Sequence, residues 1–204
     1  MSILLVRHGE TLLNAARTLQ PAATPLGPRG EAQARALARR LARERIGAIL
    51  SSDLPRAWQT ASAIAEATGV AVIAEPLLQE RNFGDLRGQP YDGLGFDPLR
   101  MAGAPPGGES EATFRARVAQ AFGRMTSLAA ALDGDLVVVS HGLVIGALLD
   151  RHVRLDDGIV RPERLGNTGL TILAAEPPHR VGLLDCTAHL AGDTHESAQS
   201  LSGG

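Results

Sequence analysis

The sequence predicts an α/β fold with a mainly parallel sheet. Short apolar runs alternate along the chain with segments of helical periodicity, the arrangement in which each strand is followed by a crossover helix. Two of these runs, 3–6 and 136–139, are continuously apolar, as is typical of strands covered on both faces. With 204 residues, the chain is long enough for one such domain without a disulfide or metal staple.

Each element of this fold has its own signal. The apolar stripe of Ala34, Leu37 and Leu41 has helical spacing, and Gly69 stands where the C-cap of a helix is expected. Helices are therefore expected at 28–45, 55–68, about 110–132 and 143–151. Strands are expected at 3–6, 46–50, 70–74, 136–139, 170–173 and 181–184.

The segment 81–108 breaks this alternation. It holds seven Gly and four Pro and has few periodic apolar positions. A loop this long inside a compact domain is usually a lid or a binding segment. We therefore predict a single domain over 1–190 with a lid at 81–108, followed by a polar tail at 191–204.

The composition excludes several mechanisms and partners. All 20 basic residues are Arg, so there is no P-loop lysine, Schiff-base lysine or Ser-Lys dyad. The net charge of −2, without a long basic run, argues against nucleic acid as a partner. We expect no targeting segment, because the apolar run 3–6 near the N-terminus is too short for a signal peptide and follows no basic region. We expect no membrane span, because the longest uncharged apolar run, 136–149, is too short. With Cys186 as the single cysteine, the sequence predicts a cytoplasmic protein, and a homodimer is compatible with it.

The sharpest chemical signal follows the first predicted strand. Arg7-His8-Gly9-Glu10-Thr11 would place a bidentate phosphate binder beside a potential nucleophile, where open α/β sheets bind their ligands. His141 follows the apolar run 136–139 in the same way. If these two strands are neighbours in the sheet, His8 and His141 face the same crevice. The alternative is a structural histidine at a strand end.

The segment 4–11 resembles the signature of the histidine phosphatase superfamily, in its phosphoglycerate mutase-like branch. Further segments agree in order, so that the resemblance covers about residues 3–190. They are Asn14; Thr24-Pro25-Leu26 with Gly30 and Gln33-Ala34; Ser51-Ser52-Asp53-Leu54-Pro55-Arg56-Ala57 with Thr60-Ala61; Glu80 with Phe83-Gly84; Gly107-Gly108-Glu109-Ser110; and Val139-Ser140-His141-Gly142. The resemblance implies a three-layer α/β/α sandwich with a mainly parallel mixed sheet.

The resemblance also implies how the roles are divided. His8 is the expected nucleophile, which attacks as neutral imidazole and forms a phosphohistidine. Glu80 is expected to protonate the leaving-group oxygen and then to deprotonate the attacking water. The groups expected to bind the phosphate oxygens are Arg7, Asn14, Arg56 and His141. No metal and no other cofactor takes part in this scheme.

The sequence also offers an alternative acid and a potential metal site. Glu10 is the nearest rival to Glu80 as the acid, although in the family pattern it is a signature residue. Asp185, Cys186 and His189 are three potential metal ligands close together in the sequence. We expect no metal there, because the chain has neither a second cysteine nor an HExxH pattern.

These features predict a metal-independent phosphatase that acts on small phosphorylated metabolites. The segment between Glu80 and Glu109 would cover the leaving group, and its only cations are Arg81, Arg87 and Arg100. Its side chains expected to line a pocket are Tyr91, Leu94, Phe96, Leu99 and Met101. The alternative is a cofactor-dependent phosphoglycerate mutase, which needs more positive charge in this segment. A homologue that only binds phosphorylated ligands or a partner protein is a further alternative.

Overall fold

The computed structural model describes residues 1–191, so residues 192–204 of the predicted tail lie outside the described part. Seven strands form one mixed sheet in the order β3-β2-β4-β1-β6-β7-β5. They are β1 (Ser2–Arg7), β2 (Ile46–Ser51), β3 (Val72–Ala74), β4 (Asp135–Ser140), β5 (Arg154–Leu155), β6 (Leu170–Ala174) and β7 (Arg180–Cys186). Strands β1 to β4 pair in parallel, and β6 runs antiparallel to both of its neighbours. The predicted α/β class with a mainly parallel mixed sheet is confirmed.

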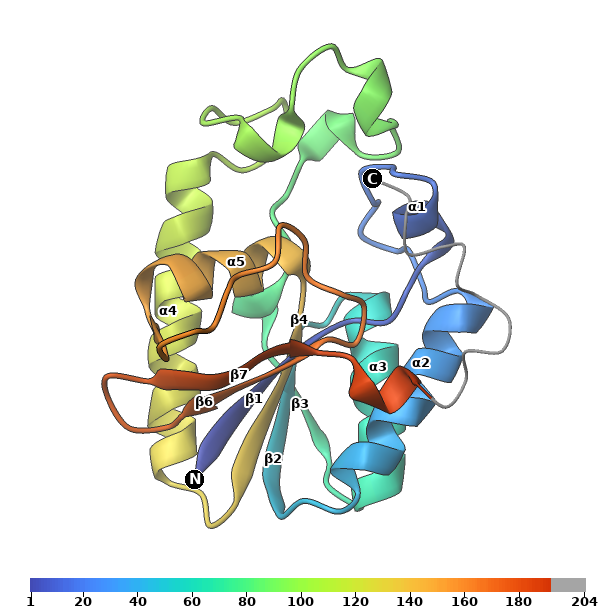
Figure 1. Ribbon diagram of the computed structural model, residues 1–204. Coiled ribbons are helices and arrows are strands. Elements are labelled where there is room, and N and C mark those ends of the chain that lie inside the picture. The colour runs from blue at the N-terminus through green and yellow to red at the C-terminus, as the bar shows by residue number, and fades with distance from the viewer. Residues whose placement is uncertain (192–204) are drawn as a thin grey trace.

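Helices cover both faces of this sheet (Figure 1). They are α2 (Pro28–Leu41) and α3 (Pro55–Thr68) on one face, with α4 (Glu111–Ala130) and α5 (Gly142–Arg151) on the other. The residues of β1 alternate between the two cores: Ile3 and Leu5 pack with α4 and α5, whereas Leu4 and Val6 pack with α2 and α3. A strand between two apolar layers needs apolar residues at every position, which explains the continuous run in the sequence.

Most predicted elements are present, but several ends differ. The helix expected at 28–45 ends at Leu41, and Arg45 instead helps to join β2 to β4, because its carbonyl accepts from Asp135 N at 2.8 Å. The strand expected from residue 70 begins at Val72. The short helix α1 (Leu12–Ala15), which begins at a capping box, and the two-residue strand β5 were not predicted, since neither is long enough to show a periodicity.

The predicted lid segment, 81–108, contains three short 3₁₀ helices. They are η2 (Gly84–Leu86), η3 (Tyr91–Gly93) and η4 (Pro98–Arg100). Figure 1 shows the segment in green beyond the carboxyl ends of β1 and β4, above the start of α4. Arg81 is buried and ties its ends together, donating to Met101 O at 2.6 Å, Gly103 O at 3.1 Å and Glu109 O at 3.2 Å. Within residues 1–191, no helix combines the length and apolar character that crossing a bilayer requires.

Candidate active site

The two histidines of the predicted site lie side by side. Strands β1 and β4 pair in parallel, and their last residues, Arg7 and Ser140, lie opposite each other. His8 and His141 are the residues that directly follow these two strands. The centroids of their rings are 5.1 Å apart, and both side chains are buried. The two strands are therefore neighbours, and the histidines share one crevice at the carboxyl end of the sheet.

The loop after β1 is held in place by helices α2 and α3. Gly9 N donates to Thr60 Oγ1 at 3.1 Å, and Glu10 N donates to Gln33 Oε1 at 2.8 Å. The loop also lies so close to α2 that a Cβ atom on Gly9 would be 2.5 Å from the carbonyl oxygen of Gly30. These contacts fix the backbone on which His8 sits, which matters because a catalytic side chain must be held to within a fraction of an ångström.

The tautomer of His8 follows from the hydrogen bond of its imidazole ring. Its Nδ1 lies 2.7 Å from Gly9 O, and a carbonyl oxygen can only accept, so Nδ1 carries the proton. The lone pair is then on Nε2. Burial lowers the pKa of His8 well below 6.5, and the positive charges of Arg56 and Arg7 lower it further. The imidazole is therefore neutral near pH 7, which is the form that can act as a nucleophile.

His141 is supported by a serine that the sequence analysis left without a role. Its Nε2 lies 2.8 Å from Ser52 Oγ, which in turn accepts from Leu54 N at 3.3 Å. The pKa of His141 is also lowered well below 6.5, first by burial and then by His8, Arg56 and Arg7. When the Ser52 hydroxyl donates to Nε2, the proton of this neutral imidazole is on Nδ1.

Both arginines of the site are constrained by the protein but keep donors free. Arg7, at the end of β1, donates through Nη1 to Leu165 O, and Arg56, in the first turn of α3, lies 3.5 Å from Ala22 O through Nη1. Burial lowers the pKa of Arg56 to about 10, so it stays charged near neutral pH. The Nε atoms of Arg7 and Arg56 are fully buried and have no hydrogen-bond partner among residues 1–191. His141 Nδ1 is also buried and has no hydrogen-bond partner among these residues.

Glu80 lies just before the predicted lid in the sequence, and its carboxyl group contacts the first turn of helix α5. Its Oε2 accepts from Leu143 N at 3.2 Å, and its Oε1 accepts from Arg81 N at 2.9 Å. Burial raises the pKa of this carboxyl group, while these two backbone donors, Arg56 and Arg7 oppose the rise. A raised pKa favours the acid form of a glutamate, which is the form that can donate a proton. The rival Glu10 pairs instead with Arg29 at 3.3 Å.

Two asparagines lie next to the histidine pair. Asn14 caps α1, and its Oδ1 accepts from Thr11 N at 3.3 Å and from Asn167 Nδ2 at 3.4 Å. Asn167 Nδ2 also donates to His8 O at 3.0 Å. Asn14 lines the cavity of the site, and no residue of 1–191 accepts a hydrogen bond from its Nδ2.

The site opens into a cavity of about 1540 Å³ that the predicted lid helps to line. Of the side chains expected there, Tyr91, Phe96 and Leu99 line it, whereas Leu94 and Met101 do not. Burial raises the pKa of Tyr91, and the charge of Glu80 raises it further.

The cations of this cavity differ in how they are used. Arg81 is occupied by backbone carbonyls, and Arg100 pairs with Asp97 at 3.3 Å. Arg87 and Arg164 line the cavity and have no acidic partner among the residues the structure describes. Arg164 was missed by the sequence analysis. It lies with Asn167 in the irregular segment between β5 and β6, where neither periodicity nor a matched motif marks a residue.

The three potential metal ligands near the end of β7 have other partners. Asp185 accepts from Gly166 N at 2.9 Å through Oδ2, and Cys186 Sγ lies 3.3 Å from Arg40 Nη1. His189 Nε2 lies 3.0 Å from Thr168 Oγ1. In the described part of the chain, no group of three or more His, Cys, Asp or Glu side chains has an arrangement that could hold a metal ion.

The sheet order, the histidine pair and the two buried arginines beside it, Arg7 and Arg56, define the class of α/β proteins with a histidine phosphatase fold. The chain belongs to the histidine phosphatase superfamily (branch 1), whose family model matches residues 3–182. The predicted family and the three-layer sandwich it implied are both confirmed.

Three relatives illustrate the range of this family. The probable phosphoglycerate mutase GpmB of Yersinia enterocolitica is 35% identical over 181 residues, which are 84% of this chain and 83% of that protein. The solved structure of a mycobacterial glucosyl-3-phosphoglycerate phosphatase in complex with VO3 is 28% identical, with a TM-score of 0.75, and covers 91% of this chain and 98% of that one. A putative α-ribazole-5′-P phosphatase from Escherichia coli K-12 is 26% identical, with a TM-score of 0.78, covering 92% and 97%. The family therefore includes proteins named as mutases and as phosphatases.

Proposed function

We propose that this protein is a metal-independent phosphatase that hydrolyses small phosphorylated metabolites through a phosphohistidine at His8. One observation supports this most directly. Three buried nitrogens, Arg7 Nε, Arg56 Nε and His141 Nδ1, lie next to a neutral histidine and have no hydrogen-bond partner within residues 1–191. Buried donors are almost always paired in folded proteins, so donors left free at one place indicate a ligand rich in acceptors. A phosphoryl group offers three oxygens to such donors.

In the first step, the phosphoryl group passes from the substrate to His8. The lone pair on Nε2 attacks phosphorus, and the bond between phosphorus and the leaving-group oxygen breaks. Arg7, Arg56 and His141 stabilise the negative charge on the three equatorial oxygens, with Asn14 Nδ2 as a further donor. Glu80, in the acid form that its raised pKa favours, gives its proton to the departing oxygen.

In the second step, water replaces His8 on phosphorus. Glu80, now a carboxylate, takes a proton from the water as the water oxygen attacks. The bond between phosphorus and His8 Nε2 breaks, and inorganic phosphate leaves with the same donors around it. The imidazole returns to its neutral form, and Glu80 is protonated again for the next cycle.

The cavity of about 1540 Å³ leaves room for a leaving group beyond the phosphate. The leaving group would meet Tyr91, Phe96 and Leu99 of the lid and the unpaired charges of Arg87 and Arg164. This mixture suits a polar metabolite with an apolar portion. We also propose a cytoplasmic location, for which the support is the lone cysteine, Cys186.

Hydrolysis of 4-nitrophenyl phosphate in the presence of EDTA tests this function. We expect the rate to be unchanged after metal is removed, because the arginines and histidines supply the positive charge. Vanadate should inhibit competitively, since it adopts the five-coordinate geometry of phosphoryl transfer and accepts the same hydrogen bonds. Loss of activity in EDTA that a divalent metal restores would contradict the proposal.

A phosphoglycerate mutase is the second candidate, because the Yersinia enterocolitica relative carries that name. A mutase must retain the phosphoryl group on His8 until a second acceptor replaces the first product. Incubation with 3-phosphoglycerate and 2,3-bisphosphoglycerate distinguishes the two. A phosphatase releases inorganic phosphate, whereas rapid isomerisation with little release would favour the mutase, and no turnover of any phosphate ester would favour a binding protein.

A further inference from the structure

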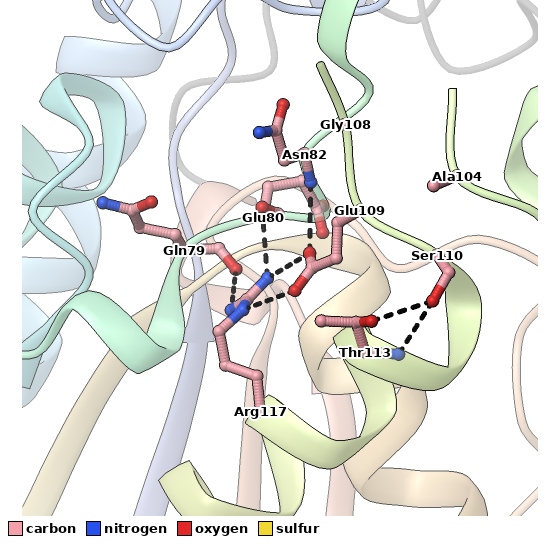
Figure 2. A pocket seen from close by; sticks show the side chains of 9 residues that line it. All are labelled: Gln79, Glu80, Asn82, Ala104, Gly108, Glu109, Ser110, Thr113 and Arg117. Atoms are coloured by element: carbon pink, nitrogen blue, oxygen red, sulfur yellow. Dashed lines mark hydrogen bonds and ion pairs between the residues drawn. The ribbon is translucent and has the colours of Figure 1, made fainter. Parts of the chain in front are cut away.

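A small cavity behind Glu80 contains an ion pair that the proposed reaction does not use (Figure 2). The cavity has a volume of about 410 Å³ and lies between the ends of the predicted lid and helix α4. Arg117 of α4 binds Glu109 with two parallel hydrogen bonds, from Nε to Oε1 at 2.9 Å and from Nη2 to Oε2 at 2.8 Å. Both side chains are mostly buried, with exposed fractions of 19% and 11%.

The same guanidinium group also holds the backbone that leads to Glu80. Its Nη1 donates to Leu77 O and Gln79 O, both at 2.7 Å, and its Nη2 lies 3.5 Å from Glu80 O. Figure 2 shows the fork of Arg117 directed at the carbonyl groups of Gln79 and Glu80 and at the Glu109 carboxylate together. Only arginine has enough N–H groups, in a fixed planar arrangement, to bind a carboxylate and two carbonyls at once.

Arg117 can fix this segment because its own helix is rigidly placed. Phe114, Val118 and Met125 of α4 are buried against the sheet. From the opposite direction, Ser140 Oγ donates to Leu78 O at 2.8 Å. The segment 77–80 is thus held between α4 and the end of β4, the strand that carries His141.

Glu109 extends this connection to the residues after Glu80. Its Oε2 accepts from Asn82 N at 3.3 Å, and its own N–H donates to Asn82 O at 2.8 Å. The Arg117–Glu109 pair therefore joins the chain on both sides of Glu80 to one helix. By contrast, the carboxyl group of Glu80 accepts just two hydrogen bonds from the described residues, from Arg81 N and Leu143 N.

The geometry points to a positioning role: the Arg117–Glu109 ion pair fixes the backbone around Glu80 so that its carboxyl group meets the leaving-group oxygen. This inference rests on the proposed role of Glu80 as the general acid. A displacement of about 1 Å from the productive geometry costs an enzyme on the order of 100-fold in rate. Movement of the segment 77–80 would therefore mainly lower the rate of the step in which Glu80 donates its proton.

The substitution Arg117→Lys tests the role, because lysine keeps the charge but loses the fork. The readout is kcat/KM for two substrates of similar shape, phenyl phosphate and 2,4-dinitrophenyl phosphate. Phenolate is a poor leaving group that needs protonation, and dinitrophenolate leaves without it. We expect kcat/KM for phenyl phosphate to fall about tenfold or more, and that for dinitrophenyl phosphate to change by less than about twofold. For both substrates kcat/KM reports the transfer of the phosphoryl group to His8, so the rate of the later hydrolysis does not affect the comparison.

A merely structural ion pair would lower both values by the same factor, and that result would overturn the inference. Glu109→Gln removes the charge from the other partner and should shift the ratio of the two values in the same direction, which keeps the test informative if Arg117→Lys folds poorly. Arg180→Lys is the control. Arg180 pairs with Asp156 at 2.9 Å and does not contact the segment 77–80, so the ratio should not change in this variant.

The double variant Arg117→Lys/Glu80→Gln separates this inference from the function on which it rests. If Arg117 acts through Glu80, Arg117→Lys should have no further effect on the ratio once Glu80 is replaced. An equal effect in both backgrounds would overturn the positioning role alone. If Glu80→Gln by itself leaves the ratio unchanged, Glu80 is not the acid, and both the inference and that part of the proposed function fail.

Discussion

Replacing His8 by alanine should lower kcat/KM for 4-nitrophenyl phosphate by on the order of 10⁴-fold or more. The reason is that His8 supplies the atom that takes the phosphoryl group, and no neighbour can replace it. Both histidines have lowered pKa values, but His141 uses its Nε2 in the contact with Ser52. The phosphate-binding groups remain, so vanadate or inorganic phosphate should still bind. Isothermal titration of phosphate and steady-state kinetics measure the two effects separately.

His179→Ala is the control for this variant. His179 packs edge to face against Phe122, with ring centroids 5.0 Å apart, at the end of the molecule away from the site. Its replacement removes an imidazole of the same size without touching a group of the mechanism, and the activity should stay within about twofold. Near-normal activity in the folded His8→Ala protein would disprove nucleophilic catalysis by His8.

The second large effect is expected from Glu80→Gln. Glutamine can still accept the hydrogen bond from Leu143 N, but it has no proton to give. Loss of a general acid typically costs about 10²–10⁴-fold, so kcat/KM for phenyl phosphate should fall by that order. Substrate binding should be weakened far less, because the arginines and His141 make the contacts with phosphate. Inhibition by vanadate, which needs no proton transfer, checks that the phosphate site is intact.

The pH profile of the same variant gives an independent test. Burial raises the pKa of Glu80, so the carboxyl group keeps its proton to a higher pH than an ordinary glutamate. Activity towards phenyl phosphate should fall as the pH rises through this pKa, because the acid form is lost. His8 has a lowered pKa, so it stays neutral over this range and does not produce the same limb. In Glu80→Gln the alkaline limb should disappear, and a limb that persists unchanged would assign it to another group.

The sheet and the histidine pair could be predicted because their signals are local. A strand buried on both faces must be apolar at every position, as 3–6 and 136–139 are. Parallel strands end at the same edge, so a histidine directly after each run was expected to meet the other one. Helix α3 matches the predicted range 55–68, because Gly69 ends it at a φ of +74° that favours glycine.

The contacts that tune the site could not be predicted, because they join residues far apart in the sequence. Nothing near Glu80 in the chain indicates that Leu143 N would donate to it, or that Arg117 would hold its backbone. Arg117 stands in the sequence as one of many arginines on a helix. Its role depends on the carbonyl groups of 77–80 being turned towards it, and the direction of a carbonyl group leaves no trace in residue types.

Arg81 shows the same limit in the opposite sense. The sequence marked it as a cation available to a substrate, since it stands at the start of the predicted lid. The structure buries it and turns its donors to Met101 O, Gly103 O and Glu109 O. Arg87 and Arg164 instead line the cavity without an acidic partner in the described chain, and only the fold brings them to one opening.

The central claim, transfer of the phosphoryl group to His8, can be tested by trapping the intermediate. Glu80→Gln is the suitable protein, because dinitrophenyl phosphate does not need the acid to react, whereas hydrolysis of the phosphohistidine needs the base. After rapid mixing and quenching at alkaline pH, where phosphohistidine survives, peptide mass spectrometry should find one phosphoryl group on the peptide that contains His8. The burst of dinitrophenol should equal the amount of enzyme. Turnover without a burst and without phosphorylated His8, or a phosphoryl group on another residue, would contradict the account.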